Sequence, residues 1–247
     1  MSDNLKQVRL EIIKHIVNSF HIKEFIADTL YATGLKDSKF QNAKGMFAWN
    51  KPYSEVEKME QIFDGIIVFH ANINAWKFPL IYDEKTQIIF LLMSENNLNQ
   101  KRKQKITETN PPHYSKILSE INQPYSNQIS LLPKQVTNPI PILNKFITDE
   151  RINTLPEGLK LAIVSCQQLQ GDLLKVTCAL FDKNLLLIDD EVDWSSYIDL
   201  NYDSDNITTK LEQKIQDVNA NTLVMNTLKE NLISLKQDVK INTTTEI

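Results

Sequence analysis

A run of basic residues followed by a histidine–tyrosine pair is the part of the sequence with the most potential for chemistry. The basic residues are Lys101, Arg102, Lys103, Lys105 and Lys116. His113 and Tyr114 stand between the last two of them, after a Pro-Pro pair. Lysine and arginine bind phosphate, histidine can act as a general acid or base, and tyrosine can stabilise developing charge. The stretch therefore predicts contact with RNA or single-stranded DNA, and metal-independent cleavage by His113 if the protein is an enzyme.

The same stretch is also typical of a solvated helix end. Basic clusters of this length are common on protein surfaces. Tyr114 shares an apolar helical face with Ile117 and Leu118, which favours packing over acid catalysis. His113 falls in the first turn of that helix, where the helix dipole disfavours the charged imidazole and where the ring can cap the helix. Both interpretations stay open from sequence.

His70 is a third candidate catalytic residue. It ends the β-rich run "IIVFH", in phase with Ile66 and Val68, and would meet the basic run if the sheet brought the strand end close. A histidine that is hydrogen-bonded at a strand end is the alternative. The 4 histidines and 2 cysteines show no zinc-ligand spacing, and no glycine-rich phosphate loop is present. We therefore predict neither a metal nor a cofactor.

Composition limits where nucleic acid could bind. The 247-residue chain has a net charge of −4, so a phosphate-binding surface must be a local basic patch. No run reaches the roughly 18 apolar residues of a membrane helix, and the N-terminus lacks signal-peptide features. A turn at Gln170-Gly171 would place Cys166 opposite Lys175 and Cys178 on the other sheet face, which argues against a disulfide. These features predict a cytoplasmic protein without membrane attachment.

The order of predicted elements indicates an α+β fold with N-terminal helices, two mainly antiparallel β units and a long C-terminal amphipathic helix. Residues 1–125 are expected to form a helical and β-hairpin region that carries the basic patch, and residues 126–141 a proline-rich crossing segment. Residues 142–247 are expected to form the second β unit and the C-terminal helix, within a separate domain or one continuous domain. Pro79 predicts that its strand is at an edge or starts late.

Apolar residues spaced three or four apart over residues 206–240 predict the C-terminal helix. Its stripe is suited to packing on the protein's own sheet, to a protein partner or to a homo-oligomer. A break near Asn219 favours packing within the chain over a regular coiled coil.

Residues 5–125 resemble an uncharacterised bacterial and phage-borne family. The resemblance rests on "AWKF" with Trp76 and Phe78, on the hairpin "LIYDEKTQIIFLLMSE", and on "HYSKILSEIN" with His113, Tyr114 and Asn122. It implies an association with toxin–antitoxin or phage-defence genes, and it implies no particular chemistry.

Two functions fit the sequence. The first is a toxin or defence effector that binds or acts on nucleic acid through the basic run, His113 and Tyr114. The second is a non-enzymatic inhibitor or regulator in phage–host conflict, which binds a protein through the C-terminal helix and the sheet edges. They are distinguished by whether His70, His113 and the basic run converge on one cleft.

Overall fold

A computed structural model describes residues 3–34, 44–104, 107, 111–125 and 138–199. All of these residues belong to one unit of the chain, Met1–Asp199. Lys105, most of the predicted crossing segment and the predicted helix over 206–240 lie outside the described residues.

The N-terminal region is helical, as the apolar spacing predicted. Its helices are α1 (Asp3–Lys6), α2 (Leu10–Ser19), α3 (Lys23–Ala32), α4 (Lys44–Glu57) and α5 (Met59–Ile62). Pro52 lies inside α4 and not near its first turn, because the helix begins further upstream than the sequence suggested. No helix among the described residues is long and apolar enough to cross a membrane.

One mixed sheet, six-stranded within the described residues, organises the rest of the unit. Its strands, in spatial order, are β1 (Ile66–Ile73), β2 (Trp76–Asp83), β3 (Ile88–Ser94), β4 (Lys160–Leu169), β5 (Asp172–Leu180) and β6 (Val192–Asp193). The two predicted β units form one sheet because β3, at the edge of the first, pairs with β4, at the edge of the second. This pair is parallel, and every other neighbouring pair is antiparallel. Residues on both sides of the segment 126–141 thus contribute to one sheet.

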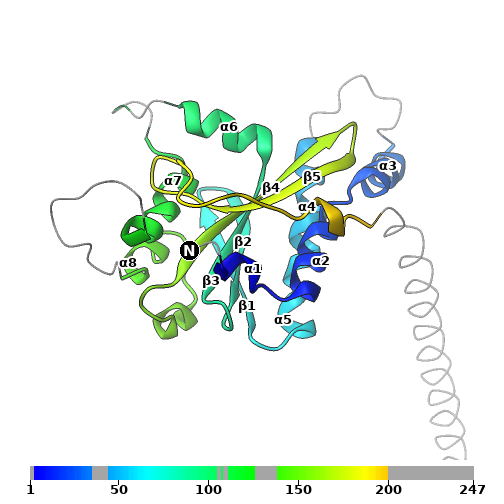
Figure 1. The fold of residues 1–247 in the computed structure, drawn as a ribbon. Coiled ribbons are helices and arrows are strands. Elements are labelled where there is room, and N and C mark those ends of the chain that lie inside the picture. The colour runs from blue at the N-terminus through cyan, green and yellow to red at the C-terminus, as the bar shows by residue number, and fades with distance from the viewer. Residues whose placement is uncertain (1–2, 35–43, 105–106, 108–110, 126–137, 200–247) are drawn as a thin grey trace, which may run out of the picture. The chain divides into compact units, whose positions relative to one another are not determined.

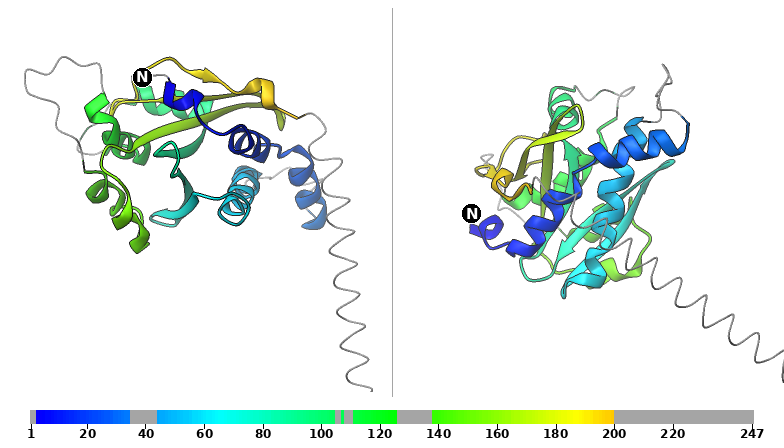
Figure 2. Two further views of the ribbon diagram at one scale, coloured as in Figure 1. Left: turned by 60° about the horizontal axis from the view of Figure 1, so that its bottom comes forward. Right: turned by 90° about the vertical axis from the view of Figure 1, so that its right-hand side faces the viewer.

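Helices cover both faces of this sheet. Figure 1 shows α2, α4 and α5 on one side of β1–β3, and α6 (Glu95–Lys103), α7 (Tyr114–Leu118) and α8 (Ile140–Leu143) on the other. In the right-hand view of Figure 2 the blue and cyan helices face the viewer. Three short 3-10 helices complete the described part: η1 (Ser119–Tyr125), η2 (Glu150–Thr154) and η3 (Ser195–Tyr197).

Alternation along the strands divides the core into two layers. Val68, Phe90 and Val164 pack with α2 and α4, whereas their neighbours Phe69, Leu91 and Ile163 pack with α7 and α8. Because both faces are buried, the strands read as nearly continuous apolar runs.

Pro79 lies in β2, which is an inner strand and not an edge strand. Only the pairing of β2 with β3 starts late. β2 pairs with β1 along its whole length, including Pro79 opposite His70, but its pairing with β3 begins only at Leu80. The missing N–H of Pro79 therefore falls just outside the ladder with β3.

The predicted register of the cysteine-containing hairpin is wrong by one residue. A β-bulge between Gln167 and Gln168 sets Cys166 opposite Val176, and Cys178 opposite Val164. Both thiols therefore lie in the same core layer, beside α2 and α4, and both are free and buried.

The apolar run "NLLLID" does not form the predicted strand. The Asp182 carboxylate accepts hydrogen bonds from the N–H groups of Asn184 and Leu186, and Leu185 adopts a left-handed φ of 60°. The chain consequently turns here, and the last strand of the described residues is the short β6 within the acidic segment "DDEVDW".

Candidate functional site: an aromatic pocket beside a basic helix end

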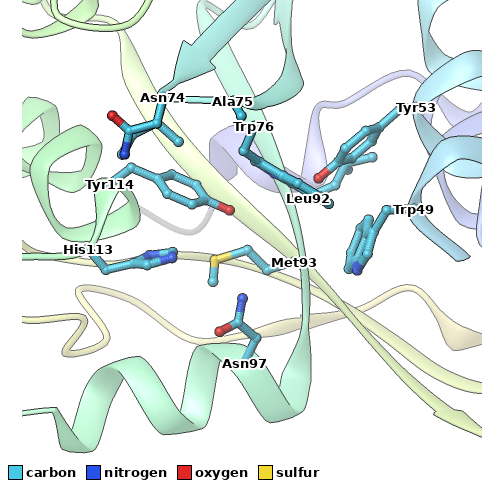
Figure 3. Close-up of a pocket in the computed structure, with 11 residues that line it drawn as sticks. Trp49, Tyr53, Asn74, Ala75, Trp76, Leu92, Met93, Asn97, His113 and Tyr114 are labelled. Atoms are coloured by element: carbon cyan, nitrogen blue, oxygen red, sulfur yellow. The ribbon is translucent and has the colours of Figure 1, made fainter. Parts of the chain in front are cut away.

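A pocket of about 780 Å³ opens at the end of the sheet that carries the β1–β2 turn. Its wall contains five rings: Trp49, Tyr53, Trp76, His113 and Tyr114. Figure 3 shows these rings entering from three directions, with Trp49 and Tyr53 on one side and His113 and Tyr114 on the other. The pocket thus lies where both helical layers meet the end of β3.

Helix α4 and the β1–β2 hairpin supply one wall. Trp49 and Tyr53 are one helical turn apart, so their rings lie on one face of α4, with centroids 5.4 Å apart. The Trp76 ring lies 6.3 Å from that of Tyr53 at an interplanar angle of 71°. Ile73 pairs with Trp76 across a two-residue turn in which Asn74 has a φ of 54°, and asparagine tolerates this conformation better than most residues.

His113 and Tyr114 supply the opposite wall. His113 is the N-cap of α7: its Nδ1 accepts from the backbone N–H of Ser115 (3.3 Å) and lies 2.9 Å from the Ser115 Oγ. Because Nδ1 is an acceptor, the neutral ring carries its proton on Nε2. The Tyr114 ring lies 4.0 Å from the His113 ring and stacks on Phe78 at 4.6 Å. These contacts fix the orientation of both site rings.

The ionisable groups of the pocket are neutral at pH 7. Burial, and to a smaller extent the positive charges of Lys101 and Lys116, lower the pKa of His113 to about 4. Burial raises the pKa of Tyr114 to about 12. Burial also raises the pKa of Tyr53, against the effect of a hydrogen bond with the Trp76 side chain. The pocket is therefore suited to a flat, uncharged group, and His113 is only a weak base.

Replacing His113 by Asn is expected to make the free energy of unfolding depend less on pH below neutrality. The pKa of His113 is about 4 in the folded protein and about 6.5 in the unfolded chain. Protonation therefore favours the unfolded chain, so the folded protein loses stability as the pH falls from about 6.5 towards about 4. Allowing for partial solvent screening, the loss is on the order of 2 kcal/mol.

Asn keeps the N-cap of α7 but does not titrate, so it is a matched control for this effect. Urea unfolding of both proteins at pH 7, 5.5 and 4 measures the difference. An equal loss of stability in wild type and His113→Asn would contradict the prediction.

Three residues of the basic run, Lys101, Arg102 and Lys103, lie in the last turn of α6, whose N-cap is Ser94. The positive charge of Lys101 helps to lower the pKa of His113, although Lys101 does not line the pocket. The Arg102 guanidinium lies 5.7 Å from the Phe181 ring centroid, and Lys103 is exposed. A shared role of the basic run and the His-Tyr pair stays a prediction.

Lys116 has a different environment from the α6 residues. It is buried, and its Nζ donates to the backbone carbonyl of Gln104 (3.0 Å), the C-cap residue of α6. Lys116 therefore ties α7 to the end of α6 and adds positive charge beneath the site.

His70 lies outside the pocket. It shares the sheet face of Ile66 and Val68, whereas Tyr114 packs on the opposite face. Its Nδ1 is 3.4 Å from the Oε1 of Glu57, at the end of α4. The structure thus places His113 and Tyr114 in the pocket wall and leaves His70 and the described residues of the basic run outside it, so these predicted site residues do not converge on one cleft.

The sequence analysis missed the pocket residues Trp49, Tyr53 and Asn97. The first two carried a usable signal, since two large aromatic residues at helical spacing mark one helix face. Asn97 carried none, because a polar residue at the start of a helix is ordinary. Among the described residues, no group of three or more His, Cys, Asp or Glu side chains is placed to hold a metal ion.

The fold and the pocket define an α+β protein with a neutral aromatic pocket beside a basic helix end. The chain belongs to a family of unknown function (DUF5986), whose model matches residues 3–246. This agrees with the resemblance to an uncharacterised family. No curated protein and no solved structure matches the chain.

Proposed function

We propose that the protein binds single-stranded RNA or DNA by inserting a base among the rings of the aromatic pocket, while the last turn of α6 contacts the phosphates. The observation that carries this proposal is the hydrogen bond from the Lys116 Nζ to the Gln104 carbonyl, which ties the basic end of α6 to the helix that begins with His113 and Tyr114 of the pocket wall. An aromatic surface and a cationic surface at one site are the two parts that single-strand binding requires.

The rings supply affinity for a base. Stacking a base on an aromatic side chain contributes about 1–3 kcal/mol. Trp49 and Trp76 are both partly exposed in the pocket wall, so their faces are accessible to a ligand. A base in a duplex is already stacked, which favours a single-stranded ligand.

The last turn of α6 supplies phosphate contacts. Three consecutive basic residues, Lys101, Arg102 and Lys103, concentrate positive charge in a chain with a net charge of −4. A local patch of this kind attracts a polyanion that the rest of the protein repels.

Binding fits the site better than cleavage does. General base catalysis at pH 7 works best with a pKa near 7, and the pKa of His113 is about 4. The pKa of Tyr114 is raised, so the hydroxyl is not activated as a nucleophile. We therefore assign His113 and Tyr114 to holding the base. The resemblance of residues 5–125 supports a place for this binding in phage–host conflict, as a toxin or defence effector.

Replacing Lys101, Arg102 and Lys103 by Ala is expected to weaken binding at least tenfold at low salt. Three phosphate contacts give wild type a slope of log affinity against log salt of about −2 for single strands, and the triple variant a slope near zero. Fluorescence anisotropy of labelled RNA and DNA single strands over a salt series measures both quantities.

The matched control is Lys14/Lys85/Lys145→Ala, which removes the same amount of charge from exposed lysines on other elements. It is expected to bind as wild type does. Trp76→Ala is expected to weaken binding by about tenfold with the salt slope unchanged, because it removes stacking and no charge. Absence of binding to either nucleic acid at low salt would refute the proposal and turn attention to a protein partner.

A further inference from the structure

We infer that the Tyr114 hydroxyl holds the bound base by a hydrogen bond to the edge of its ring. The pocket then prefers a flat ring with polar edge atoms to a hydrocarbon ring of the same shape. This inference rests on the proposed nucleic-acid binding and adds a polar contact to the stacking described above.

Tyr114 presents its hydroxyl to the pocket, while neighbouring rings cover its own ring. The ring centroids of His113 and Phe78 lie 4.0 and 4.6 Å from that of Tyr114, and the residue is only 8% exposed. Figure 3 shows the Tyr114 side chain pointing from its wall into the pocket with the hydroxyl foremost. Stacking on a base therefore falls to the partly exposed Trp49 and Trp76, and Tyr114 reaches a ligand through its hydroxyl.

Among the residues that the structure describes, none forms a hydrogen bond with the Tyr114 hydroxyl. The other phenol of the wall differs, because the Tyr53 hydroxyl hydrogen-bonds with the Trp76 side chain. Most polar side-chain atoms that are removed from bulk water have a partner in the protein or in a bound molecule. The rings packed around Tyr114 fix the position of its oxygen, so this hydroxyl is positioned for a ligand.

A phenol hydroxyl can donate one hydrogen bond and can also accept. Every base carries donors and acceptors on its edge, so this contact fits each base and makes no choice among them. A hydrocarbon ring offers no such atoms and would cover the hydroxyl without pairing it, which costs free energy. A site that hydrogen-bonds its ligand discriminates strongly against an analogue that lacks the bonding group. The pocket thus distinguishes a base from a ring that can only stack.

The test uses labelled DNA strands about eight nucleotides long, each with a single ring among abasic sites, so that only this ring can enter the pocket. One strand carries thymine, and the other carries difluorotoluene, which has the shape of thymine and no strong hydrogen-bonding group. In Tyr114→Phe, the ratio of thymine affinity to difluorotoluene affinity is expected to fall about fivefold, the effect of one hydrogen bond between uncharged groups. The stacking strengths of the two rings cancel in this comparison of ratios, because the variant keeps every ring of the wall.

Tyr82→Phe is the matched control, since Tyr82 is a buried tyrosine of the same core layer that does not line the pocket. It is expected to keep the wild-type ratio. Urea unfolding supplies a second measurement. The midpoint of Tyr114→Phe is expected at or above that of wild type, because the hydroxyl makes no bond within the described protein. A lowered midpoint would give the hydroxyl a structural role and overturn the inference.

The outcomes separate this inference from the proposed function. An unchanged ratio in Tyr114→Phe, an equal fall in Tyr82→Phe, or a thymine strand that binds no better than a fully abasic strand overturns the hydrogen bond. A mixed-sequence strand with all its bases tests the proposed function in the same assay. Failure of wild type to bind this strand overturns nucleic-acid binding and the Tyr114 contact with it.

Discussion

Replacing Asn122 by Ala is expected to lower the free energy of unfolding by roughly 3–5 kcal/mol, because it leaves three buried backbone groups without a partner. Asn122 is fully buried in η1. Its Nδ2 donates to the carbonyls of Leu161 (2.6 Å) and Phe181 (2.9 Å), and its Oδ1 accepts from the Leu161 N–H (2.9 Å). No water can replace these bonds without opening the packed layer around them.

The position of Asn122 explains why its effect should be large. The ladder between β4 and β5 ends with Ala162 opposite Leu180, so Leu161 and Phe181 come one residue beyond the last pair. The Asn122 amide occupies this place and satisfies backbone groups of both chain segments. Asn122 therefore joins η1 to the ends of β4 and β5. Its loss affects both the sheet and the layer that carries Tyr114.

Gln123→Ala is the matched control, since the neighbouring side chain is exposed, and its expected change is within about 0.5 kcal/mol. Urea unfolding followed by tryptophan fluorescence and circular dichroism measures both variants. A shift of the Asn122→Ala midpoint equivalent to less than about 1 kcal/mol would show that the network is worth no more than an ordinary hydrogen bond.

Local patterns predicted the elements well and their assembly poorly. The hairpin of β2 and β3 was evident because two β-rich runs flank a polar turn, and that information is local in sequence. The parallel contact between β3 and β4 was not, since it joins Ile88 to Lys160 and no short-range pattern encodes such a pairing. This one contact turns two expected β units into one sheet.

Single residues caused the errors of register and strand assignment. The bulge between Gln167 and Gln168 moves Cys166 by one position, and sequence alone does not reveal a bulge that lacks glycine. The side chain of Asp182 competes for backbone N–H groups and converts an apolar run into a turn. In both places a side-chain or backbone detail overrode the apolar pattern.

The candidate site was predictable on one wall only. His113 and Tyr114 follow a proline stop and a basic run, which marked them in the sequence. The other wall comes from Trp49 and Tyr53, which are separated from them in the sequence by the strands β1 to β3 and by α6. Their contribution became evident only when the sheet placed α4 and α7 at the same end of β3.

Replacing Asp83 by Ala is expected to destabilise the protein by about 3–5 kcal/mol, because the largely buried Arg9 guanidinium then keeps only the exposed Glu11 carboxylate, at 3.9 Å, as a counter-charge. The Asp83 side chain is fully buried, and its Oδ1 lies 3.2 Å from the Arg9 Nη2. Its carboxylate also accepts from the Lys85 N–H (3.3 Å) and the Thr86 Oγ1 (2.9 Å), within the turn between β2 and β3. The pair thus connects the residue that caps α2 to the central hairpin.

A double-mutant cycle measures the coupling free energy between Arg9 and Asp83 separately from their other contacts. Asp83→Asn keeps the shape of the side chain and removes the charge, so it is expected to be destabilising on its own, as is Arg9→Met. The double variant is expected to be more stable than the sum of the two single effects predicts, since no uncompensated charge then remains buried. A Lys23→Met and Asp172→Asn cycle at an exposed ion pair provides the comparison, with an expected coupling below about 1 kcal/mol. Additive effects in both cycles would mean that the Asp83 carboxylate acts through its turn hydrogen bonds and not through Arg9.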